Sequence, residues 1–286
     1  MSSFPSPPRG GFREDRVIWL FGHPRSGTTW LGRLLTDGFG LQMWNEPYLG
    51  QVFGFVTQLR RNEPARFDDP TFWMSDRQRD AWRASLNTFL NDVIARQAGP
   101  AKGRSGLLIK EPNGTPNASL FAEVMPQARI VFMLRDPRDV IASLLDARKP
   151  GSWMAERVTA EFDRDAIVNG SIRRFLRIGE VLEELAAVAE GRVVIVGYEA
   201  LRADAEAEVR RAAPVLGLDW DQARVRGAID RHSYERIPDD RKGPGKFVRT
   251  AKVGGWRDEL TDAEQRRIHR KLGQFLESQG YATGDG

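Results

Sequence analysis

The chain has 286 residues, of which 41% are hydrophobic and 29% charged, the ordinary balance of a soluble globular protein. Its 43 lysines and arginines outnumber its 39 acidic residues by only four, and both signs are interleaved, so the charge predicts a local anion site and no nucleic-acid-binding face. The lack of cysteine excludes disulfides and thiolate chemistry, and the three histidines lie too far apart in sequence to predict a metal site.

The N-terminal segment, residues 1–15, is polar and rich in proline and glycine. This composition predicts a flexible tail in front of one domain over residues 16–282. The tail has no apolar core of signal-peptide length, and the longest apolar runs, such as Val17–Phe21, are too short to span a bilayer. We therefore expect a cytoplasmic protein without a membrane span. The sequence does not indicate its oligomeric state.

Five short apolar runs alternate with longer segments of helical periodicity. The runs at residues 130–134 and 192–196 do not alternate between apolar and polar residues, which is typical of parallel strands buried on both faces. Alternating strands and helices predict a single α/β domain with a central parallel sheet flanked by helices. The predicted strands are Arg16–Phe21, Leu41–Trp44, Gly106–Lys110, Ile130–Leu134 and Arg192–Val196.

Apolar residues at helical spacing predict two long amphipathic helices, around residues 82–94 and 172–185. We expect Phe89 on the buried face of the first and Leu176 on the buried face of the second. A third helix follows Thr261, which has the spacing of a capping box with the glutamate three residues later.

Two segments lack regular periodicity, residues 45–80 and 233–258. Both are rich in proline, glycine, arginine and tryptophan. Long irregular segments in a compact domain are often lids or binding loops. We expect both to be irregular and to contribute to a binding site.

The segment after the first predicted strand, Gly22–Thr29, reads GHPRSGTT and has the spacing G-x-x-x-x-G-x-T of a phosphate-binding loop. The common form of that loop has lysine where Thr28 stands. Its glycines would let successive N–H groups point at an anion, and the following helix would add its positive end. Since Arg25 supplies the charge and the lysine is missing, we expect an anion bound by arginines and not a magnesium-bound nucleoside triphosphate.

A second anion site is predicted after the strand at residues 130–134. Arg135 follows this strand, and Asp136 can cap a helix that begins at Pro137. Ser143 lies seven residues after Asp136 and projects from nearly the same side. Because ligands of open α/β sheets bind at the carboxyl ends of strands, we expect Arg135 and Ser143 to share one anion.

Four segments, taken in order, resemble sulfotransferases that use 3′-phosphoadenosine 5′-phosphosulfate (PAPS). PRSGTTW resembles the family's 5′-phosphosulfate loop and LRDPRDVIAS its 3′-phosphate motif. VGYEALRADAEAEVRRAAPVLGL resembles its Tyr-Glu-x-Leu segment, and KFVRTAKVGGWRDELT its C-terminal F-x-R-K-G-x-x-G-x-W segment. The resemblance covers residues 17–260. It implies a P-loop-like sulfotransferase fold, PAPS as co-substrate, its desulfonated form PAP as product, and no metal.

The resemblance also implies a nucleotide site built from all four segments. Trp30 would stack on the adenine, an interaction of about 1–3 kcal/mol, and Tyr198 would face its edge. Thr250 and Ala251 replace the family's usual Lys-Gly, so Lys252 is the candidate for the missing charge. The residues implied to bind phosphate or sulfate groups are Arg25, Ser26, Gly27, Thr28, Thr29, Arg135, Ser143 and Arg249.

Arg25 stands where the family most often has lysine. Arginine is effectively never deprotonated and cannot act as an acid, so its expected role is to stabilise the departing phosphate electrostatically. Arginine at this position resembles the bacterial and carbohydrate-type members of the family.

Transfer to a hydroxyl group needs a base near the acceptor. The histidine that serves in the cytosolic branch is absent from LLIKEPNG. Glu46 resembles the Glu-Pro base of the carbohydrate-type and bacterial members, Glu111 is the alternative, and Lys110 would be an assisting cation near the sulfate. We interpret His23 as a structural or gating residue. The candidate walls of the acceptor pocket are Tyr48, Phe53, Trp73, Trp153 and Phe247.

The sequence therefore predicts an enzyme that moves a sulfuryl group from PAPS to a hydroxyl of a carbohydrate, lipid or small natural product. Two alternatives are a P-loop kinase-like enzyme, against which the missing lysine argues, and a non-catalytic PAP-binding module. Binding of PAP without transfer to any acceptor would favour the module.

Overall fold

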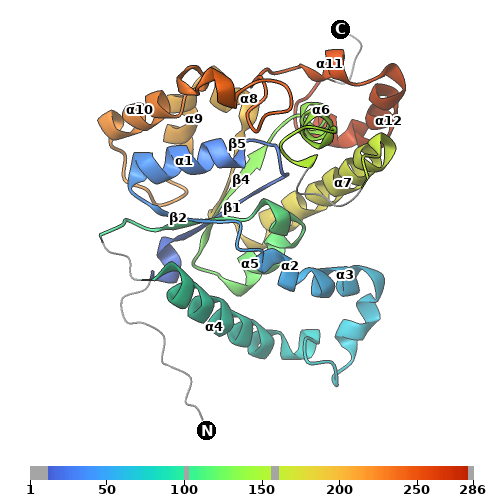
Figure 1. Cartoon of the computed structure of the whole chain (residues 1–286). Helices are drawn as coiled ribbons and strands as arrows, with labels where there is room; N and C mark the ends of the chain where they lie inside the picture. Colours follow the sequence, from blue (N-terminus) through green and yellow to red (C-terminus); the bar gives the residue numbers. More distant parts are fainter. Residues whose placement is uncertain (1–11, 100–102, 156–160, 283–286) are drawn as a thin grey trace.

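The computed structural model describes residues 12–99, 103–155 and 161–282 (Figure 1). Five parallel strands form one sheet in the order β2-β3-β1-β4-β5. The predicted single α/β fold with a central parallel sheet is confirmed, and each predicted strand end lies within one residue of the observed end. The strands are β1 (Val17–Gly22), β2 (Gln42–Asn45), β3 (Leu107–Lys110), β4 (Arg129–Leu134) and β5 (Val193–Gly197).

The strands at the centre of the sheet are covered on both faces, as their continuous apolar runs predict. All six residues of β1 are buried. Its side chains alternate between two cores: Trp19 and Phe21 point into one, and Ile18 and Leu20 into the other. The edge strand β5 is less covered, with Ile195 at 39% exposure.

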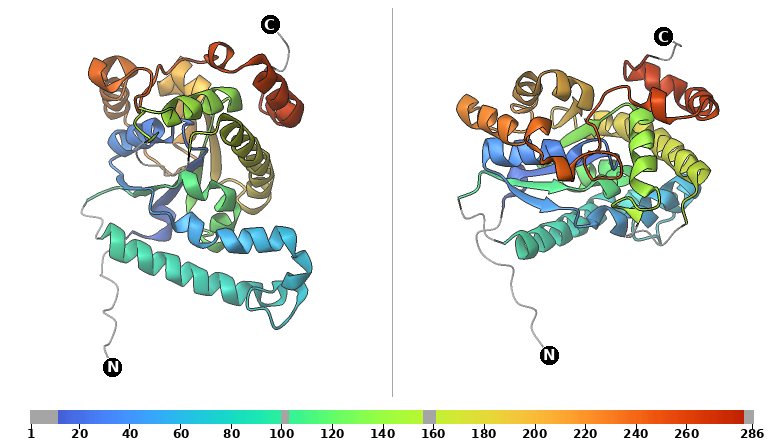
Figure 2. Two further views of the ribbon diagram at one scale, coloured as in Figure 1. Left: turned by 45° about the vertical axis from the view of Figure 1, so that its right-hand side comes forward. Right: turned by 45° about the horizontal axis from the view of Figure 1, so that its top comes forward.

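Helices cover both faces of the sheet (Figures 1 and 2). The face shared with Ile18 and Leu20 is covered by α1 (Thr28–Phe39), α8 (Tyr198–Ala203), α9 (Ala205–Ala212) and α10 (Gln222–Arg231). The face shared with Trp19 and Phe21 is covered by α2 (Leu49–Val52), α3 (Gly54–Asn62), α4 (Arg79–Ala98), α5 (Ala118–Val124), α6 (Pro137–Arg148), α7 (Arg164–Val188), α11 (Trp256–Glu259) and α12 (Asp262–Ser278).

The two long predicted helices correspond to α4 and α7, but two of their expected core residues are on the surface. Phe89 is 43% exposed and Leu176 is 45% exposed. Their chain neighbours Leu90 and Phe175 are buried instead, because successive residues of a helix point about 100° apart. The predicted burial of Phe89 and Leu176 was wrong for this reason.

The segment at residues 45–80 is more regular than predicted. It forms α2 and α3, followed by 3-10 turns at Pro64–Asp68 and Asp76–Gln78. Val56 and Leu59 of α3 pack against the core. This single apolar stripe on a nine-residue helix is too short to stand out in the sequence.

The segment at residues 233–258 is irregular, as predicted, apart from 3-10 turns at Tyr234–Arg236 and Asp239–Arg241 and the start of α11. The helix after it begins with the predicted capping box, in which Thr261 accepts from the N–H of Glu264 and the Glu264 carboxylate accepts from the N–H of Thr261.

The predicted N-terminal tail lies mostly outside the described residues. Where its last part is described, it contacts the domain: Phe12 packs against the core, and the Glu14 carboxylate accepts hydrogen bonds from the N–H of Gln127 and the amide of Asn87, both at 2.7 Å.

Candidate functional site

A cavity of about 1080 Å³ lies at the carboxyl ends of the strands. Each of the five strands is followed by, or ends in, one predicted site residue that lines this cavity. In the order of the strands across the sheet these are Glu46, Lys110, Arg25, Arg135 and Tyr198. Pockets for small molecules are usually roughly 300–1000 Å³, so this cavity stands at the upper end of that range.

The shape of the loop after β1 is fixed by glycines and by one threonine from the turn after the neighbouring strand β3. Gly22 and Gly27 have φ of 147° and 102°, and a Cβ at Gly27 would lie 2.7 Å from the ring of Tyr198. The Thr115 hydroxyl accepts from the Gly22 N–H at 2.9 Å and donates to the Gly22 carbonyl at 2.8 Å. These contacts fix the curled shape of the loop, and α1 begins at Thr28.

Arg25 lies at the centre of the cavity, in the left-handed region with φ of 76°. Its Nε donates to the Ser143 hydroxyl at 3.2 Å and its Nη2 to the Phe247 carbonyl at 2.7 Å. Its guanidinium lies 5.5 Å from the ring centre of Trp153 and 5.2 Å from that of Phe247. Burial, with the charge of Arg135, lowers the pKa of Arg25 to about 10, so it remains charged at neutral pH.

Arg135 and Tyr198 lie on one side of Arg25, in what we call the β4–β5 half of the cavity. The Arg135 guanidinium lies 4.1 Å from the ring centre of Tyr198. It donates to the carbonyls of Arg25 at 3.3 Å and Lys252 at 3.2 Å. Its Nε is buried and has no hydrogen-bond partner among the residues that the structure describes. A bound anion would supply that partner.

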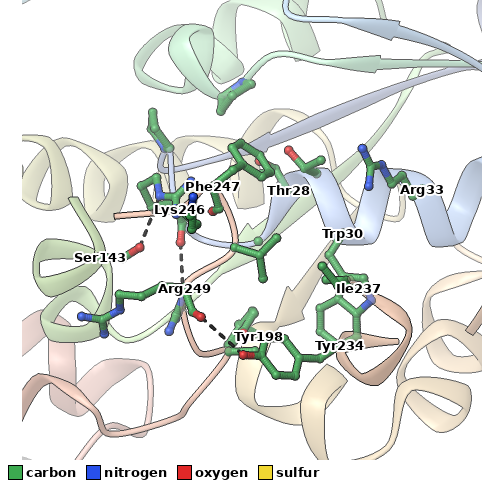
Figure 3. Close-up of a pocket in the computed structure, with 18 of the residues that line it drawn as sticks. Thr28, Trp30, Arg33, Ser143, Tyr198, Tyr234, Ile237, Lys246, Phe247 and Arg249 are labelled. Atoms are coloured by element: carbon green, nitrogen blue, oxygen red, sulfur yellow. Dashed lines mark hydrogen bonds between the residues drawn. The ribbon is translucent and has the colours of Figure 1, made fainter. Parts of the chain in front are cut away.

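The remaining predicted nucleotide residues divide between the cavity and its surroundings. Trp30 lines the cavity and meets Tyr198 edge to face, with ring centres 5.9 Å apart. Arg249 also lines it and pairs with Glu259 at 3.1 Å. Figure 3 shows Trp30 of α1 near Tyr234 on one side of the cavity and Ser143 of α6 on the other.

Two residues predicted from the motifs are not on the cavity wall. Lys252 does not line it; its side chain is 60% exposed, and its ammonium pairs with Asp258 at 3.0 Å. Only the backbone carbonyl of Lys252 faces Arg135. Ser26 is 1% exposed, and its hydroxyl is buried and does not line the cavity. The next three residues of the loop, Gly27, Thr28 and Thr29, line the cavity.

Two carboxylates of α6 anchor the segment that carries Arg249, residues 242–256, which we call the strap. Asp146 accepts from the Gly245 N–H at 2.9 Å. Asp139 accepts from the N–H groups of Gly254 at 2.8 Å and Trp256 at 3.0 Å. Sequence reasoning missed both anchors. The only local signal was a second aspartate, Asp139, in the Arg-Asp-Pro-Arg-Asp motif.

Glu46 and Lys110 form a charged pair on the other side of Arg25, in the β2–β3 half of the cavity. The Lys110 ammonium donates to the Glu46 carboxylate and, at 3.1 Å, to the side chain of Asn45. The Lys110 side chain is 3% exposed and that of Glu46 31%. Glu46 is therefore a fixed carboxylate that faces the open cavity.

Glu111, the alternative base, is placed differently. Its carboxylate is fully buried, accepts from the Leu49 N–H at 3.0 Å and does not line the cavity. Burial raises the pKa of Glu111. The structure thus separates the two candidates, with Glu46 on the cavity wall and Glu111 behind it.

His23 lines the cavity but is fixed in the fold. Its ring stacks on Phe175 with 4.8 Å between ring centres, and Nδ1 lies 2.6 Å from the Pro24 carbonyl. Burial, together with the nearby charge of Arg174, lowers the pKa of His23 to about 3. The ring is therefore neutral at physiological pH.

The five predicted aromatic walls are only partly on the cavity. Tyr48, Trp153 and Phe247 line it. Phe53 instead lies in the core against Phe121, and Trp73 is a surface residue with 55% exposure. Their assignment to the wall was wrong because nothing in the sequence separates an aromatic core residue from an aromatic pocket residue.

The cavity wall also contains arginines that sequence reasoning missed, among them Arg148 at the end of α6 and Arg174 in the middle of α7. Neither belongs to a recognisable motif. Over the described ranges there is no cluster of three or more metal-ligating side chains, and no helix is long and apolar enough to cross a membrane.

Comparison with known proteins places this site in a family. A model of the sulfotransferase family matches residues 18–222. The nodulation protein NoeE of Sinorhizobium fredii is 26% identical over 279 residues, covering 91% of this chain and 64% of NoeE. The omega-hydroxy-beta-dihydromenaquinone-9 sulfotransferase Stf3 of Mycobacterium bovis is 26% identical over 254 residues, covering 71% of this chain and 63% of Stf3. The chain thus spans less than two thirds of the length of these two relatives.

The solved structure of mouse sulfotransferase SULT7A1, complexed with PAP, has the same fold. It matches with a TM-score of 0.54 at 13% identity, over 95% of this chain and 87% of that one. Since the family model spans most of the sequence, the chain belongs to the sulfotransferase family.

Proposed function

We propose that the protein transfers the sulfuryl group of PAPS to an acceptor hydroxyl and releases PAP. The observation that supports this most is the order of side chains along the carboxyl edge of the sheet. A phosphate-binding loop with Arg25 is at the centre, a carboxylate–lysine pair lies on the β2–β3 side, and an arginine over a tyrosine lies on the β4–β5 side. Such a row suits a nucleotide donor on one side and an acceptor on the other.

The β4–β5 half would bind the nucleotide. Arg135, Ser143 and Arg249 would hold the 3′-phosphate, and the buried Nε of Arg135 that has no partner in the described chain supports this assignment. Trp30 and Tyr198 would contact the adenine. The 5′-phosphosulfate would be bound by the loop, with Arg25, Ser26, Gly27, Thr28 and Thr29, and Lys252 would contribute only if it left Asp258.

The β2–β3 half would hold the acceptor, with Glu46 as base. Glu46 would take the proton of the acceptor hydroxyl while the oxygen forms a bond to sulfur. The bond between sulfur and the bridging oxygen would break in line, leaving the electron pair on the 5′-phosphate of PAP. Arg25 would stabilise this developing charge, and Lys110 would orient Glu46 and stand near the sulfate.

Two measurements test this proposal. PAP at millimolar concentration should raise the melting temperature, because it binds only the folded protein. A labelled-sulfate transfer screen over sugars, phenols, lipids and natural products should identify an acceptor. The absence of a PAP-induced shift would reject the nucleotide site, and PAP binding without transfer to any acceptor would identify a non-catalytic module.

The base is tested by a matched pair of variants. Glu46→Gln should abolish transfer and leave the PAP-induced shift intact, because the carboxylate acts on the acceptor. Glu111→Gln should keep transfer in the fraction that folds. Full activity in Glu46→Gln with loss in folded Glu111→Gln would assign the role to Glu111.

A further inference from the structure

The wall of the cavity is strongly cationic. Twelve of its lining residues are arginine or lysine, and only two, Glu46 and Asp240, are acidic. Under the proposed function, on which this inference rests, three of the cations already have donor groups to bind: Arg25, Arg135 and Arg249. Lys110 pairs with Glu46, and the other cations of the wall have no such assignment.

Arg174 projects from α7 over the β2–β3 half. Its Nη2 donates to the carbonyl of Asn113, in the turn that follows β3, at 3.3 Å. Its Nε is buried without a hydrogen-bond partner in the described parts of the chain. The cavity neighbour His23 is a neutral ring and supplies no negative charge. Arg174 therefore faces the cavity as an uncompensated cation, and burial lowers its pKa.

Arg148 is placed in a similar way at the end of α6. It follows Leu144 by one helical turn, and both line the cavity. Its Nε is also buried and unpartnered, and no carboxylate in the described ranges lies within 4.0 Å of its guanidinium. Trp153 and Met154, two further wall residues, continue the chain from this point.

A buried arginine that serves the fold of this protein looks different. Arg177, one helical turn from Arg174 on the same helix, pairs with Glu180 at 2.9 Å and with Glu184. Both Arg148 and Arg174 are half-buried, but the Nε–H of each is buried without an acceptor, and a buried donor of a charged group that lacks a partner is costly. Two such arginines on the wall of one cavity indicate a partner that arrives with a ligand.

We propose that the acceptor carries an oxyanion, a carboxylate or phosphate, in addition to the hydroxyl that receives sulfate, and that Arg148 and Arg174 bind this group. Arginine presents a planar fork of donors that matches such oxyanions. The oxyanion would fix the acceptor at one end, while Glu46 and Lys110 hold its hydroxyl at the other. These two arginines would then determine which alcohols are accepted.

The test is titration calorimetry on the protein saturated with PAP, which occupies the donor site. The probes are three hydroxy acids, 4-(hydroxymethyl)benzoate, 3-hydroxydecanoate and glucuronate, each compared with its methyl ester, and glycerol 3-phosphate compared with glycerol. At least one anion should bind about tenfold or more tightly than its neutral counterpart, as expected for a buried charged hydrogen bond. Tighter binding of a hydroxy acid would identify the group as a carboxylate, and tighter binding of glycerol 3-phosphate would identify it as a phosphate.

Arg174→Gln and Arg148→Gln should each bring this ratio close to one. Arg173→Gln, the exposed neighbour on α7, is the matched control and should leave the ratio unchanged. Arg174→Gln should leave the melting temperature nearly unchanged, because the half-buried side chain makes one long hydrogen bond, to the Asn113 carbonyl at 3.3 Å, whereas loss of a structural anchor would lower it.

Equal binding of every anion and its neutral counterpart would overturn the proposal. A preference for the anion that persists in both Arg174→Gln and Arg148→Gln would also overturn it. The anion would then bind elsewhere, at the position that the sulfuryl group of PAPS occupies and that PAP leaves open. Failure of the proposed function is distinguishable, since the protein would then either not bind PAP or bind PAP and transfer sulfate to no acceptor in the screen.

Discussion

At the scale of single residues, Arg25 is the side chain on which the proposed chemistry depends most. Arg25→Ala should lower turnover by about 10²–10³-fold, the usual cost of removing one group that stabilises developing charge. PAP affinity should fall much less, because the charge on the bridging oxygen develops fully only during transfer. The measurements are kcat with an identified acceptor and the Kd of PAP.

Arg25→Lys is the control, since it keeps the charge but cannot make both of the contacts to Ser143 and Phe247. It should retain more activity than Arg25→Ala. Equal losses of turnover and PAP affinity in Arg25→Ala would make Arg25 a binding residue only.

Residues that lie at strand ends were predicted from sequence, and residues that act across the fold were not. Arg25 and Arg135 stand next to apolar runs that identify the strand and hence the edge of the sheet. Thr115 contacts Gly22, which is 93 residues away in the sequence. Arg174 contacts Asn113, which is 61 residues away. No local pattern encodes such contacts, because they depend on how the helices pack.

At the scale of elements, α6 determines the position of the strap. Asp139→Asn should weaken PAP binding by about tenfold. The two carboxylate oxygens of Asp139 each accept from one N–H group, of Gly254 and of Trp256, and an amide has only one oxygen to offer. The strap would therefore be held less firmly, and Arg249 on it would no longer be fixed at the cavity. The measurement is the Kd of PAP by calorimetry. Asp92→Asn, an exposed aspartate on α4, is the control. Unchanged affinity in Asp139→Asn would mean that the strap is held without this anchor.

The capping box of α12 allows a prediction about stability alone. Thr261→Ala should lower the free energy of unfolding by about 1 kcal/mol, because the N–H of Glu264 loses its acceptor. Urea denaturation measures this change. PAP binding should not change, and a loss of PAP affinity would show that α12 also positions the strap.

Elements were predicted best where local signals were strong. The strands were found because continuous apolar runs leave few alternatives, and the helix starts at Pro137 and Thr261 because their caps are local. The helix α3 was missed because tertiary packing of two residues, Val56 and Leu59, stabilises it.

At the scale of the whole molecule, His23 makes stability depend on pH. Its pKa falls from 6.5 in the unfolded chain to about 3 in the fold, so the unfolded state binds the proton first as pH decreases. The contribution of neutral His23 to the free energy of unfolding is fully present above pH 6.5. It is lost as pH falls toward 3, by at most about 1.4 kcal/mol per pH unit. The measurement is the free energy of unfolding between pH 7 and 4.

His23→Phe, which keeps a ring against Phe175, should flatten this dependence. The comparison with the variant is needed because burial raises the pKa of Glu111 and Glu199, and these groups act in the opposite direction. Parallel curves for the two proteins would show that His23 does not titrate as its burial implies.

The two hydrogen bonds of Thr115 link the loop after β3 to the loop after β1. Lys110 is the last residue of β3, just before the first loop, and Arg25 lies in the second, so the Thr115 hydroxyl helps to set the spacing between Lys110 and Arg25. A displacement of about 1 Å between reacting groups can slow a reaction about 10²-fold. Under the proposed function, the distance between the acceptor at Glu46 and the donor at Arg25 would thus depend on a side chain that contacts neither of them.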